Sequence, residues 1–421
     1  AAIQQLAEGQ SVLVAAPTGT GKALEASTPV LTPLGWKPIS EIRVGDSVIG
    51  SHGKPVTVLG VYPQGNRPAY RVTFTDDVSV VCDLDHLWAV NTKWRRHKKL
   101  PWRVLTLRQI LDEGLEDGPG KRHFIPVVEP VEFQQPEQQA NVSLTGLRQK
   151  TALTQRQLAQ LIGVSQGFVA QRELGHKEIT DEYRQLVQAT LDKVGPQPRL
   201  DPYLLGLLLG DGCFSVGVPH FTSADAELIE AVQRLLPRGA ILCKAQSRPY
   251  DWFILSSQTG TRNPVVIELQ KLGLWGHRTE SKFIPHEYKF ASIEDRLAIL
   301  QGLLDSDGSM SDRGDLEYTT VSYQLAEDVA FLVRSLGGKT RITEKPTSSQ
   351  LSYRMHINLP QGMAAFRLQR KAARCPMKKK YPPTRAIASV EPAGEAEMVC
   401  ISVDAPDGCL LYTSPSPRDR Q

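Results

Sequence analysis

Three kinds of hydrophobic pattern alternate along this chain of 421 residues. Two nearly uniform apolar runs, 204–212 and 300–308, place glycine among leucines and end in Asp-Gly, which predicts two buried helices with small residues on one face. Between 147 and 191, apolar residues recur every three or four positions, which predicts amphipathic helices. Stretches such as 352–360 alternate apolar and polar residues and predict strands with one buried face.

The amphipathic stretch 147–191 predicts a small all-α unit with a tight turn at Gly163. Its apolar positions are Leu158, Leu161, Ile162, Phe168, Val169, Leu186, Val187 and Leu191. The stretch resembles the helix-turn-helix of Cro and phage-repressor proteins, which implies that it binds DNA. By that resemblance Gln155 opens the second helix, and Ser165 to Arg172 form the recognition helix. Gln166 and Gln171 then suit adenine or phosphate contacts, and Arg172 suits phosphate. A helical bundle without DNA contact is the alternative.

The first 22 residues have the pattern of a phosphate-binding loop that is not completed. An apolar run leads into APTGTGK, in which Gly19, Gly21 and Lys22 suit a nucleotide phosphate. The next position needs Ser or Thr on an opening helix, but it holds Ala23 and is followed by Pro29. We therefore interpret this segment as a phosphate-binding loop that is interrupted by an inserted protein. The loop resembles that of superfamily two helicases.

From residue 23 onward the chain resembles an intein, a self-excising protein with the mostly-β, horseshoe-shaped Hint fold. Three segments carry the resemblance in the order of the family: 23–50, 70–90 and 385–408. The matching residues of the first segment are Thr28, Val30, Thr32, Gly35, Ile39, Ile42, Val44, Gly45, Asp46 and Val48. The resemblance implies autocatalytic protein splicing, without a cofactor, that joins the flanking host segments covalently.

The departures from the family pattern point to its third class, which uses an internal Cys. Ala23 stands where most inteins carry a nucleophile, and Trp88 follows two residues after the family's His86. Cys400 stands where most members have Asp, and the resemblance makes it the nucleophile against the Lys22 carbonyl. His86 would protonate the departing nitrogen of Ala23. Asp83 replaces the usual Thr, which leaves open how the scissile bond is polarised. A buried, unreactive Cys400 is the alternative.

The last residues, 409–421, do not continue the intein pattern. They lack the expected His-Asn pair and the nucleophile of the returning host. The segment is similar to a translated sequencing adapter, and a disordered tail is the alternative. The chain as written is therefore expected to cleave at Lys22–Ala23 without completing splicing.

The two apolar helices resemble the paired motifs of LAGLIDADG homing endonucleases. Gly206 and Gly302 would allow close helix packing that brings Asp211 and Asp307 together. The resemblance implies that these two residues bind Mg²⁺ and cleave double-stranded DNA of the host gene that lacks the insertion. Lys282 is the candidate to polarise water or phosphate, with a solvated surface lysine as its alternative. Lys339 and Lys345 are equally suited to be its counterpart in the second lobe.

Composition limits the class of protein less than these motifs do. A net charge of +4 conceals two basic runs, 94–103 and 367–380, which suit phosphate contacts or a solvated face equally. Six cysteines without a CxxC pair indicate a reducing cytosol, so we expect a cytoplasmic protein. The longest apolar run is too short to span a membrane. A monomer is expected.

The predicted architecture is a multidomain protein. A Hint domain is split by an α+β endonuclease with two pseudo-symmetric lobes and by the helix-turn-helix unit. The expected boundaries are 1–22 for the host fragment, 23–135 and 376–408 for the Hint parts, 140–195 for the helix-turn-helix unit, 199–375 for the endonuclease and 409–421 for the tail. Two other functions stay open: a DNA-binding regulator with an inactive endonuclease scaffold, and a P-loop ATPase fragment.

Overall fold

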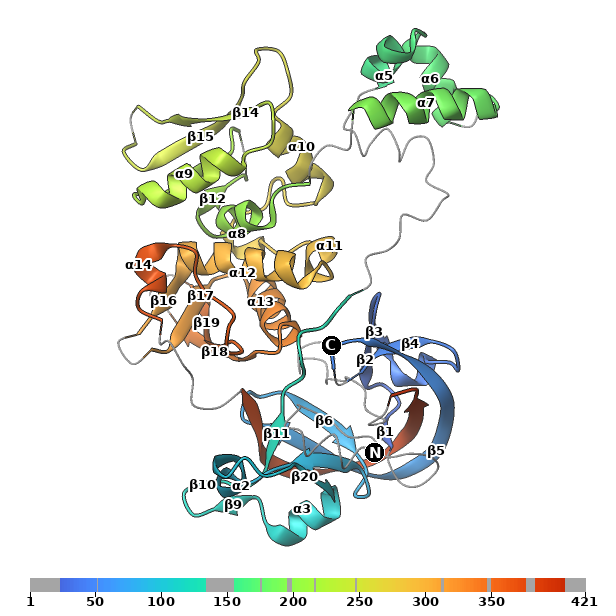
Figure 1. The fold of residues 1–421 in the computed structure, drawn as a ribbon, viewed down its shortest axis with the longest axis vertical. Coiled ribbons are helices and arrows are strands. Elements are labelled where there is room, and N and C mark those ends of the chain that lie inside the picture. The colour runs from blue at the N-terminus through green and yellow to red at the C-terminus, as the bar shows by residue number, and fades with distance from the viewer. Residues whose placement is uncertain are drawn as a thin grey trace.

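The computed structural model describes residues 23–50, 52–133, 155–174, 176–194, 199–215, 217–246, 248–311, 314–346, 350–375 and 383–405. Figure 1 shows three units: a β-rich unit, a two-lobed unit of helices and sheets, and a small helical unit. The phosphate-loop residues Gly19, Gly21 and Lys22 and the tail 409–421 lie outside the described residues. No helix of the described part is both long and apolar enough to cross a membrane.

A six-stranded sheet forms the frame of the β-rich unit, with strand order β11-β20-β1-β6-β5-β4. Its strands are β1 (Leu24–Glu25), β4 (Ser47–Ile49), β5 (Pro55–Phe74), β6 (Ser79–Cys82), β11 (Phe124–Pro126) and β20 (Thr384–Val403). The long strands β5 and β20 pair antiparallel with four register shifts. Because bulges bend a strand, these shifts allow the pair to curve around a core that both ends of the sequence build (Figure 1).

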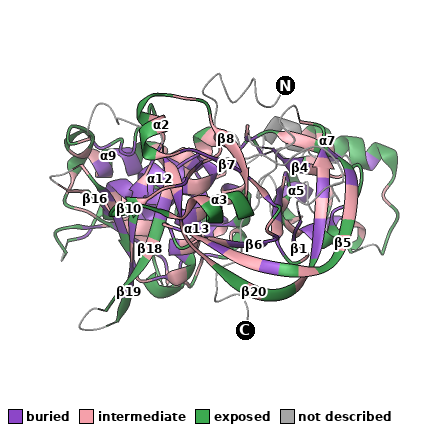
Figure 2. Cartoon of the chain, turned by 90° about the horizontal axis from the view of Figure 1, so that it is seen from below, coloured by how far each residue is buried: buried purple, intermediate pink, exposed green. Residues whose placement is uncertain are grey.

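Shorter elements complete the β-rich unit. They are β2 (Pro29–Thr32), β3 (Gly35–Pro38), the 3₁₀ turn η1 (Ile39–Glu41), β7 (Leu87–Val90), α2 (Lys93–His97), β8 (Arg103–Thr106), α3 (Leu107–Glu113), β9 (Glu116–Asp117) and β10 (Gly120–Lys121). A capping box between Thr106 and Gln109 starts α3. In Figure 2 the middle of β20 is exposed, whereas α12 of the two-lobed unit is mostly buried.

The two-lobed unit repeats one pattern of helix, two strands, helix and two strands. The first lobe contains α8 (Pro202–Asp211), β12 (Gly212–Cys213), β13 (His220–Thr222), α9 (Ala226–Leu235), β14 (Ala240–Lys244), β15 (Asp251–Ser256) and α10 (Pro264–Lys271). After η2 (Thr279–Ser281) and α11 (His286–Lys289), the second contains α12 (Ile293–Asp307), β16 (Gly308–Met310), β17 (Leu316–Thr320), α13 (Tyr323–Ser335), β18 (Lys339–Pro346), β19 (Leu351–Asn358) and α14 (Gln369–Ala372). The strand orders β12-β13-β15-β14 and β16-β17-β19-β18 correspond, so the lobes are pseudo-symmetric.

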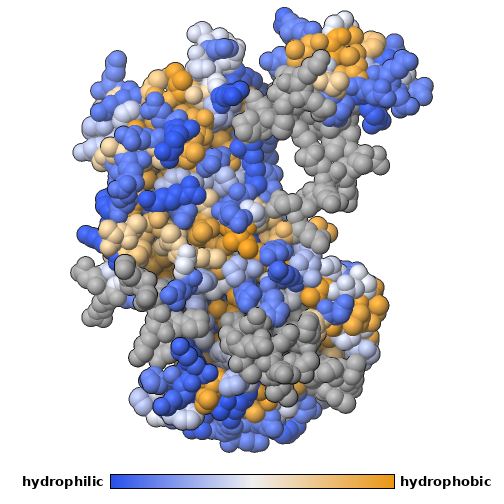
Figure 3. Space-filling model, in the orientation of Figure 1, coloured by the Kyte–Doolittle hydropathy of each residue, from blue (hydrophilic) through white to orange (hydrophobic). Residues whose placement is uncertain are grey.

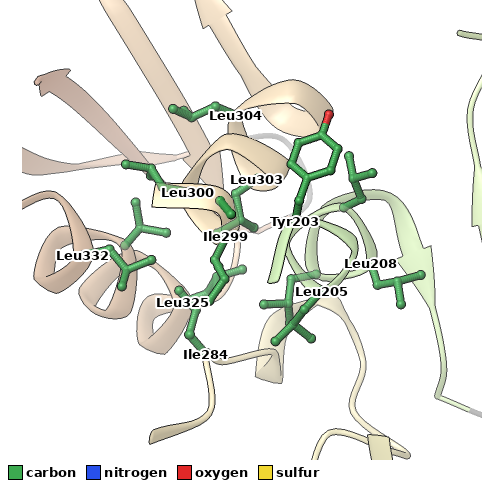
Figure 4. Close-up of a cluster of buried hydrophobic side chains, with 14 of the residues drawn as sticks. Tyr203, Leu205, Leu208, Ile284, Ile299, Leu300, Leu303, Leu304, Leu325 and Leu332 are labelled. Atoms are coloured by element: carbon green, nitrogen blue, oxygen red, sulfur yellow. The ribbon is translucent and has the colours of Figure 1, made fainter. Parts of the chain in front are cut away.

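Helices α8 and α12 pack against each other at the centre of this unit (Figures 1 and 4). A Cβ on Gly206 would lie 2.3 Å from the carbonyl oxygen of Ile299, and one on Gly302 would lie 2.4 Å from that of Tyr203. Leucines from both helices fill the surrounding core, as Figure 4 shows for Leu205 and Leu303. The backbones therefore approach closely only because both positions are glycine.

The β-rich unit is fastened to the two-lobed unit by residues 128–133. The backbone N–H of Val131 donates to the carbonyl of Ser335 over 2.8 Å. The fully buried Arg296 donates to the carbonyl oxygens of Val131 and Ser335, and its guanidinium lies 4.7 Å from the ring centroid of Phe133. A buried cation is costly unless its donors are satisfied. Arg296 therefore requires residues 128–133, here called the strap, to stay in contact with the two-lobed unit.

Three helices make up the small helical unit: α5 (Gln155–Ile162), α6 (Gln166–Glu173) and α7 (Asp181–Val194). Gly163 has a φ of 75° between the first two, as a tight turn requires. The buried core joins Leu158, Val169 and Val187, one residue from each helix. Figure 3 shows hydrophobic atoms at the centre of this unit with hydrophilic side chains around them.

The substitution Gly302→Ala is expected to destabilise the two-lobed unit by at least about 2 kcal/mol. The new Cβ would meet backbone atoms, 2.4 Å from the Tyr203 carbonyl oxygen and 2.8 Å from the Leu207 nitrogen, so the helices must separate. Urea unfolding measures the effect. Gly167→Ala, in α6 with nothing within 4 Å, is the matched control and should not destabilise the protein. Equal unfolding midpoints for the two variants would contradict the packing argument.

Candidate active sites

The carboxylates Asp211 and Asp307 are the last residues of α8 and α12. Each is followed by a glycine that begins a strand of its lobe. The Oδ2 atom of Asp307 lies only 3.1 Å from where a Cβ on Gly210 would stand, so the two helix ends meet. The fold therefore brings the two sequence-predicted carboxylates together.

The surroundings of these carboxylates disfavour their charged forms. Desolvation, and then repulsion from Asp211, raises the pKa of Asp307 to about 6, although its side chain keeps an open path to solvent. Desolvation also raises the pKa of Asp211, while Lys282 and Lys371 oppose the shift. Neither carboxylate forms a hydrogen bond or ion pair with another described residue, which is unusual for acidic groups crowded by protein atoms.

Lys282 is buried beneath the end of α8 rather than solvated on the surface. Its Nζ atom donates to the carbonyl oxygens of Leu208 (3.3 Å), Leu209 (2.9 Å), Gly210 (3.1 Å) and Gly212 (2.7 Å). The carbonyls of Leu209 and Gly210 are among those that a helix C-terminus leaves without intrahelical partners, whereas that of Leu208 also accepts the Gly212 N–H. Desolvation lowers the pKa of this lysine to about 8, against the attraction of Asp307 and Asp211.

Lys371 makes the equivalent contacts at the end of α12. Its Nζ atom donates to the carbonyl oxygens of Leu304 (2.9 Å), Asp305 (2.7 Å), Ser306 (3.2 Å) and Gly308 (2.7 Å). Each of these acceptors lies 96 residues after its counterpart around Lys282. Desolvation likewise lowers the pKa of Lys371, most strongly opposed by Asp305.

Neither lysine expected from the sequence is the counterpart of Lys282. Lys339 instead donates to the Thr75 hydroxyl of the β-rich unit over 3.1 Å, and Lys345 is exposed on β18. Lys371 lies within the basic run 367–380, and the sequence alone does not distinguish it from the other basic residues there. Its separation from Gly308 is 63 residues, whereas Lys282 lies 70 residues from Gly212, so the repeat spacing fails there. The glycine after each motif was the signal in the sequence, because each lysine donates to the carbonyl oxygen of that glycine, Gly212 or Gly308.

The residues at the two helix ends fit a divalent metal ion. Mg²⁺ prefers oxygen ligands and is commonly held by one or two carboxylates together with substrate phosphates. Asp211 and Asp307 supply two carboxylates without competing protein partners among the described residues. That part of the chain contains no group of three or more His, Cys, Asp or Glu side chains that would hold a metal by itself. The site would therefore require oxygens from substrate or water.

The second site surrounds Ala23, which is fully buried at the edge of β1. Leu24 pairs with Val399 of β20 on one side and with Cys82 of β6 on the other. The same antiparallel register, continued by one residue, places Cys400 opposite Ala23. On the β6 side, the N–H of Asp83 donates to the Ala23 carbonyl over 3.3 Å.

The alternation of side chains separates the two cysteines nearest Ala23. Cys82 points into the main core of the β-rich unit, and burial raises its pKa well above the usual value. Ala23 packs on the opposite face, in a cluster with Met398. Because Met398 and Cys400 are two residues apart on one strand, they share this face. The arrangement brings Cys400, which is partly exposed, to the side of Ala23.

His86 and Trp88 are both buried near this end of β6 and pack edge to face at 5.1 Å. Phe74 contacts the other side of the Trp88 indole at 5.7 Å. Asp83 forms an ion pair with Arg67 at 3.2 Å. Desolvation nevertheless raises the pKa of Asp83, with Arg67 opposing it. The backbone N–H of Asp83 is thus the contact that this position makes with Ala23.

The predicted DNA-binding residues of the helical unit have different surroundings. Ser165 caps α6, and Gln166 and Gln171 are exposed on it. Gln155 instead donates to Glu173 over 2.8 Å. The Arg172 guanidinium stacks 3.6 Å from the centroid of the Phe168 ring. The two glutamines are thus more accessible than Gln155 or Arg172.

Comparisons with known proteins find similarity to parts of this chain. A family model described as a LAGLIDADG-like domain matches residues 201–249 and 294–367, which include both helix ends. The replicative DNA helicase DnaB of Mycobacterium intracellulare is 27% identical over 411 residues, covering 95% of this chain and 58% of the relative. The chain thus spans little more than half the length of that curated relative.

Two solved structures are also similar in part. A gp41-1 intein variant is 33% identical and covers 21% of this chain and 61% of its own, with a TM-score of 0.18. The enzyme I-DmoI in complex with DNA and Mn is 15% identical and covers 38% of this chain and 89% of its own, with a TM-score of 0.27. The recognition drawn from the sequence, an intein with an embedded LAGLIDADG homing endonuclease in a helicase, is confirmed.

The substitution Asp307→Asn is expected to raise the melting temperature of the metal-free protein at pH 7.5. Because the pKa of Asp307 is raised from 3.8 to about 6, the ionised carboxylate destabilises the fold fully above about pH 6, and this penalty decreases as the pH falls from there toward 3.8. The difference between variant and wild type should therefore shrink at pH 5. Thermal unfolding in EDTA measures it, with the exposed Asp117→Asn as control. A difference that is absent at both pH values would contradict the assignment.

Proposed function

We propose that this chain is a self-splicing intein that also carries a site-specific, Mg²⁺-dependent DNA endonuclease. The observation that supports the endonuclease most strongly is the duplicated arrangement at the helix ends, where Asp211 and Asp307 meet and each is attracted by both Lys282 and Lys371. A structural core needs neither two carboxylates that have no partner among the residues the structure describes nor two lysines at the same helix ends. Groups with perturbed pKa values that converge at one place are typical of a functional site.

The two lobes match the symmetry of the proposed substrate. The strands of duplex DNA run antiparallel, so a pseudo-two-fold protein presents one equivalent half-site to each strand. Asp211 and Asp307 would hold the divalent ion, which when bound supplies Lewis-acid stabilisation of charge on the phosphodiester. Lys282 and Lys371 would fix the two helix ends by donating to their carbonyl oxygens. Their positive charge would then lie close to the scissile phosphates.

The proposed substrate is the host gene without the insertion. Cleavage there would leave an allele that already contains the insertion intact, because the insertion divides the recognition sequence. The target would encode the loop APTGTGK and a following Thr or Ser. The exposed Gln166 and Gln171 of α6, with Ser165 at its N-terminus, would add contacts to flanking DNA. Arg172 and Gln155 would support that surface through their internal contacts.

In the proposed splicing step, the Cys400 thiolate attacks the carbonyl carbon of Lys22. The new C–S bond forms as the C–N bond to Ala23 breaks, which leaves a thioester. The departing nitrogen takes a proton, for which His86 is the proposed donor. Trp88 packs against the His86 ring and orients it. The placement of Cys400 on the Ala23 face, with Cys82 on the other, supports this assignment.

The substitution Lys371→Met should lower the rate of double-strand cleavage by roughly 10²-fold or more, because it removes the charge beneath one half-site. Conversion of supercoiled plasmid carrying the uninterrupted host gene to linear DNA, in Mg²⁺, measures this rate. Lys345→Met, on an exposed strand position, is the matched control and should cut like the wild type. Equal rates for both variants would remove Lys371 from the site. A wild-type protein that binds but never cuts would instead favour a DNA-binding regulator.

Replacing Cys400 by Ala should abolish release of residues 1–22 by hydroxylamine, since this reagent cleaves a thioester. Mass spectrometry of a chain tagged ahead of Ala1 follows the release. Cys82→Ala should still release the fragment, because that thiol faces the core. The assignment fails if release survives Cys400→Ala and is lost in Cys82→Ala.

A further inference from the structure

The carboxylate of Asp305 connects the two lobes beside the proposed DNA-cleavage site. It is almost completely buried and accepts a hydrogen bond of 2.7 Å from the Tyr203 hydroxyl of α8. It also accepts the backbone N–H groups of Arg367 (2.9 Å) and Leu368 (3.2 Å). The Arg367 guanidinium lies over the Tyr203 ring, 4.3 Å from its centroid. One side chain therefore fixes the first helix of one lobe and the last loop of the other.

This loop carries Lys371. Leu368 is the N-cap of the one-turn helix α14, and Lys371 lies three residues further on. The Lys371 Nζ atom also donates to the backbone carbonyl of Asp305 itself, over 2.7 Å. Because α14 is a single turn, its position depends on the residues that anchor its start. The Asp305 carboxylate anchors this start through the backbone N–H groups of Arg367 and Leu368, and Glu227 of α9 accepts the next one, from Gln369.

The first lobe holds its lysine in a different way. At the positions that correspond to Asp305 and Tyr203 by the offset of 96 residues, the chain has Leu209 and Ile299, respectively. The backbone carbonyl of Lys282 instead accepts a hydrogen bond of 2.7 Å from the hydroxyl of Ser322, the N-cap of α13. The two lysines thus have equal contacts at the helix ends but unrelated supports.

We propose that Asp305 is a positioning residue for Lys371, and that Ser322 has this role for Lys282, so that cleavage of the two DNA strands is separately controlled. The inference rests on the proposed endonuclease function. If each lysine serves one strand, disturbing one support impairs one half-site and leaves the other assembled. Loss of the Asp305 anchor then produces an enzyme that nicks one defined strand.

The test follows both strands at once. A duplex from the uninterrupted host gene carries a different fluorophore on each strand, and single-turnover cleavage is measured with protein in excess in Mg²⁺. Lys371→Met and Lys282→Met first identify the strand that depends on each lysine. Asp305→Ala should then slow the Lys371-dependent strand by roughly 10²-fold, since small misplacement of a catalytic group has effects of that size. The other strand should be cut as in the wild type.

Two further variants separate positioning from general loss of structure. Asp305→Asn keeps an oxygen that accepts the backbone N–H groups, and should recover part of the lost rate on the same strand. Ser322→Ala should slow the opposite strand, the one that depends on Lys282. DNA affinity, measured in Ca²⁺, should stay unchanged in all three variants, because the defect lies in the rate and not in binding.

Opposite strand preferences for Asp305→Ala and Ser322→Ala would support the inference. Equal slowing of both strands by Asp305→Ala and Asp305→Asn, or slowing of the Lys282-dependent strand, would overturn it while the endonuclease function stands. If Asp305→Ala does not fold, Asp305→Asn and Ser322→Ala still decide between these outcomes. A wild-type protein that cuts neither strand would overturn the proposed function and the inference together.

Discussion

The backbone contact between α8 and α12 sets the geometry of the two-lobed unit, and it exists because Gly206 and Gly302 have no side chains. Any Cβ at either position would enter a space already taken by backbone atoms of the partner helix. Close approach brings both C-terminal helix ends to one place, and both ends carry unpaired carbonyl groups of partial negative charge. The carboxylates of Asp211 and Asp307 add to that charge. Packing and electrostatics therefore oppose each other at the centre of the molecule.

Two lysines, the buried Lys282 and the partly buried Lys371, relieve this opposition. Lys282 and Lys371 each donate to four carbonyl oxygens at a helix end and so neutralise it, while the two carboxylates have no hydrogen-bond or ion-pair partner in the described part of the chain. Desolvation, and then repulsion from Asp211, still raises the pKa of Asp307 to about 6, against the attraction of both lysines. An incompletely compensated pair of carboxylates is a good ligand for a cation, and a poor element of a merely stable core.

Much of this arrangement could be predicted from the chain. Glycine among leucines at helical spacing predicted the packed pair of helices. The Asp-Gly end of each helix predicted that two carboxylates come together there. The strand alternation and the family blocks predicted the curved β-rich unit, whose long strands come from residues 55–74 and 384–403. These features are local in sequence, or repeat at a fixed offset.

The features that escaped prediction depend on contacts between distant segments. Lys371 follows its motif at a different spacing from Lys282, because the loops of the two lobes differ in length. The sequence pattern predicts Asp305 only as a buried helix residue. Its hydrogen bond with the Tyr203 hydroxyl forms only when the two lobes are packed together. Neither the face of Cys400 nor that of Cys82 could be fixed without the register of β1 between β6 and β20.

The two proposed activities belong to separate units of the chain. The β-rich unit closes around Ala23 with strands from both ends of the sequence, while Arg296 and the strap at Val131 fasten it to the two-lobed unit.

A crystal of the protein with its target duplex and Mn²⁺, measured at the manganese absorption edge, tests the central claim most directly. We expect anomalous density between Asp211 and Asp307, next to a DNA phosphate. Density elsewhere, or none at a DNA-occupied centre, would contradict the account.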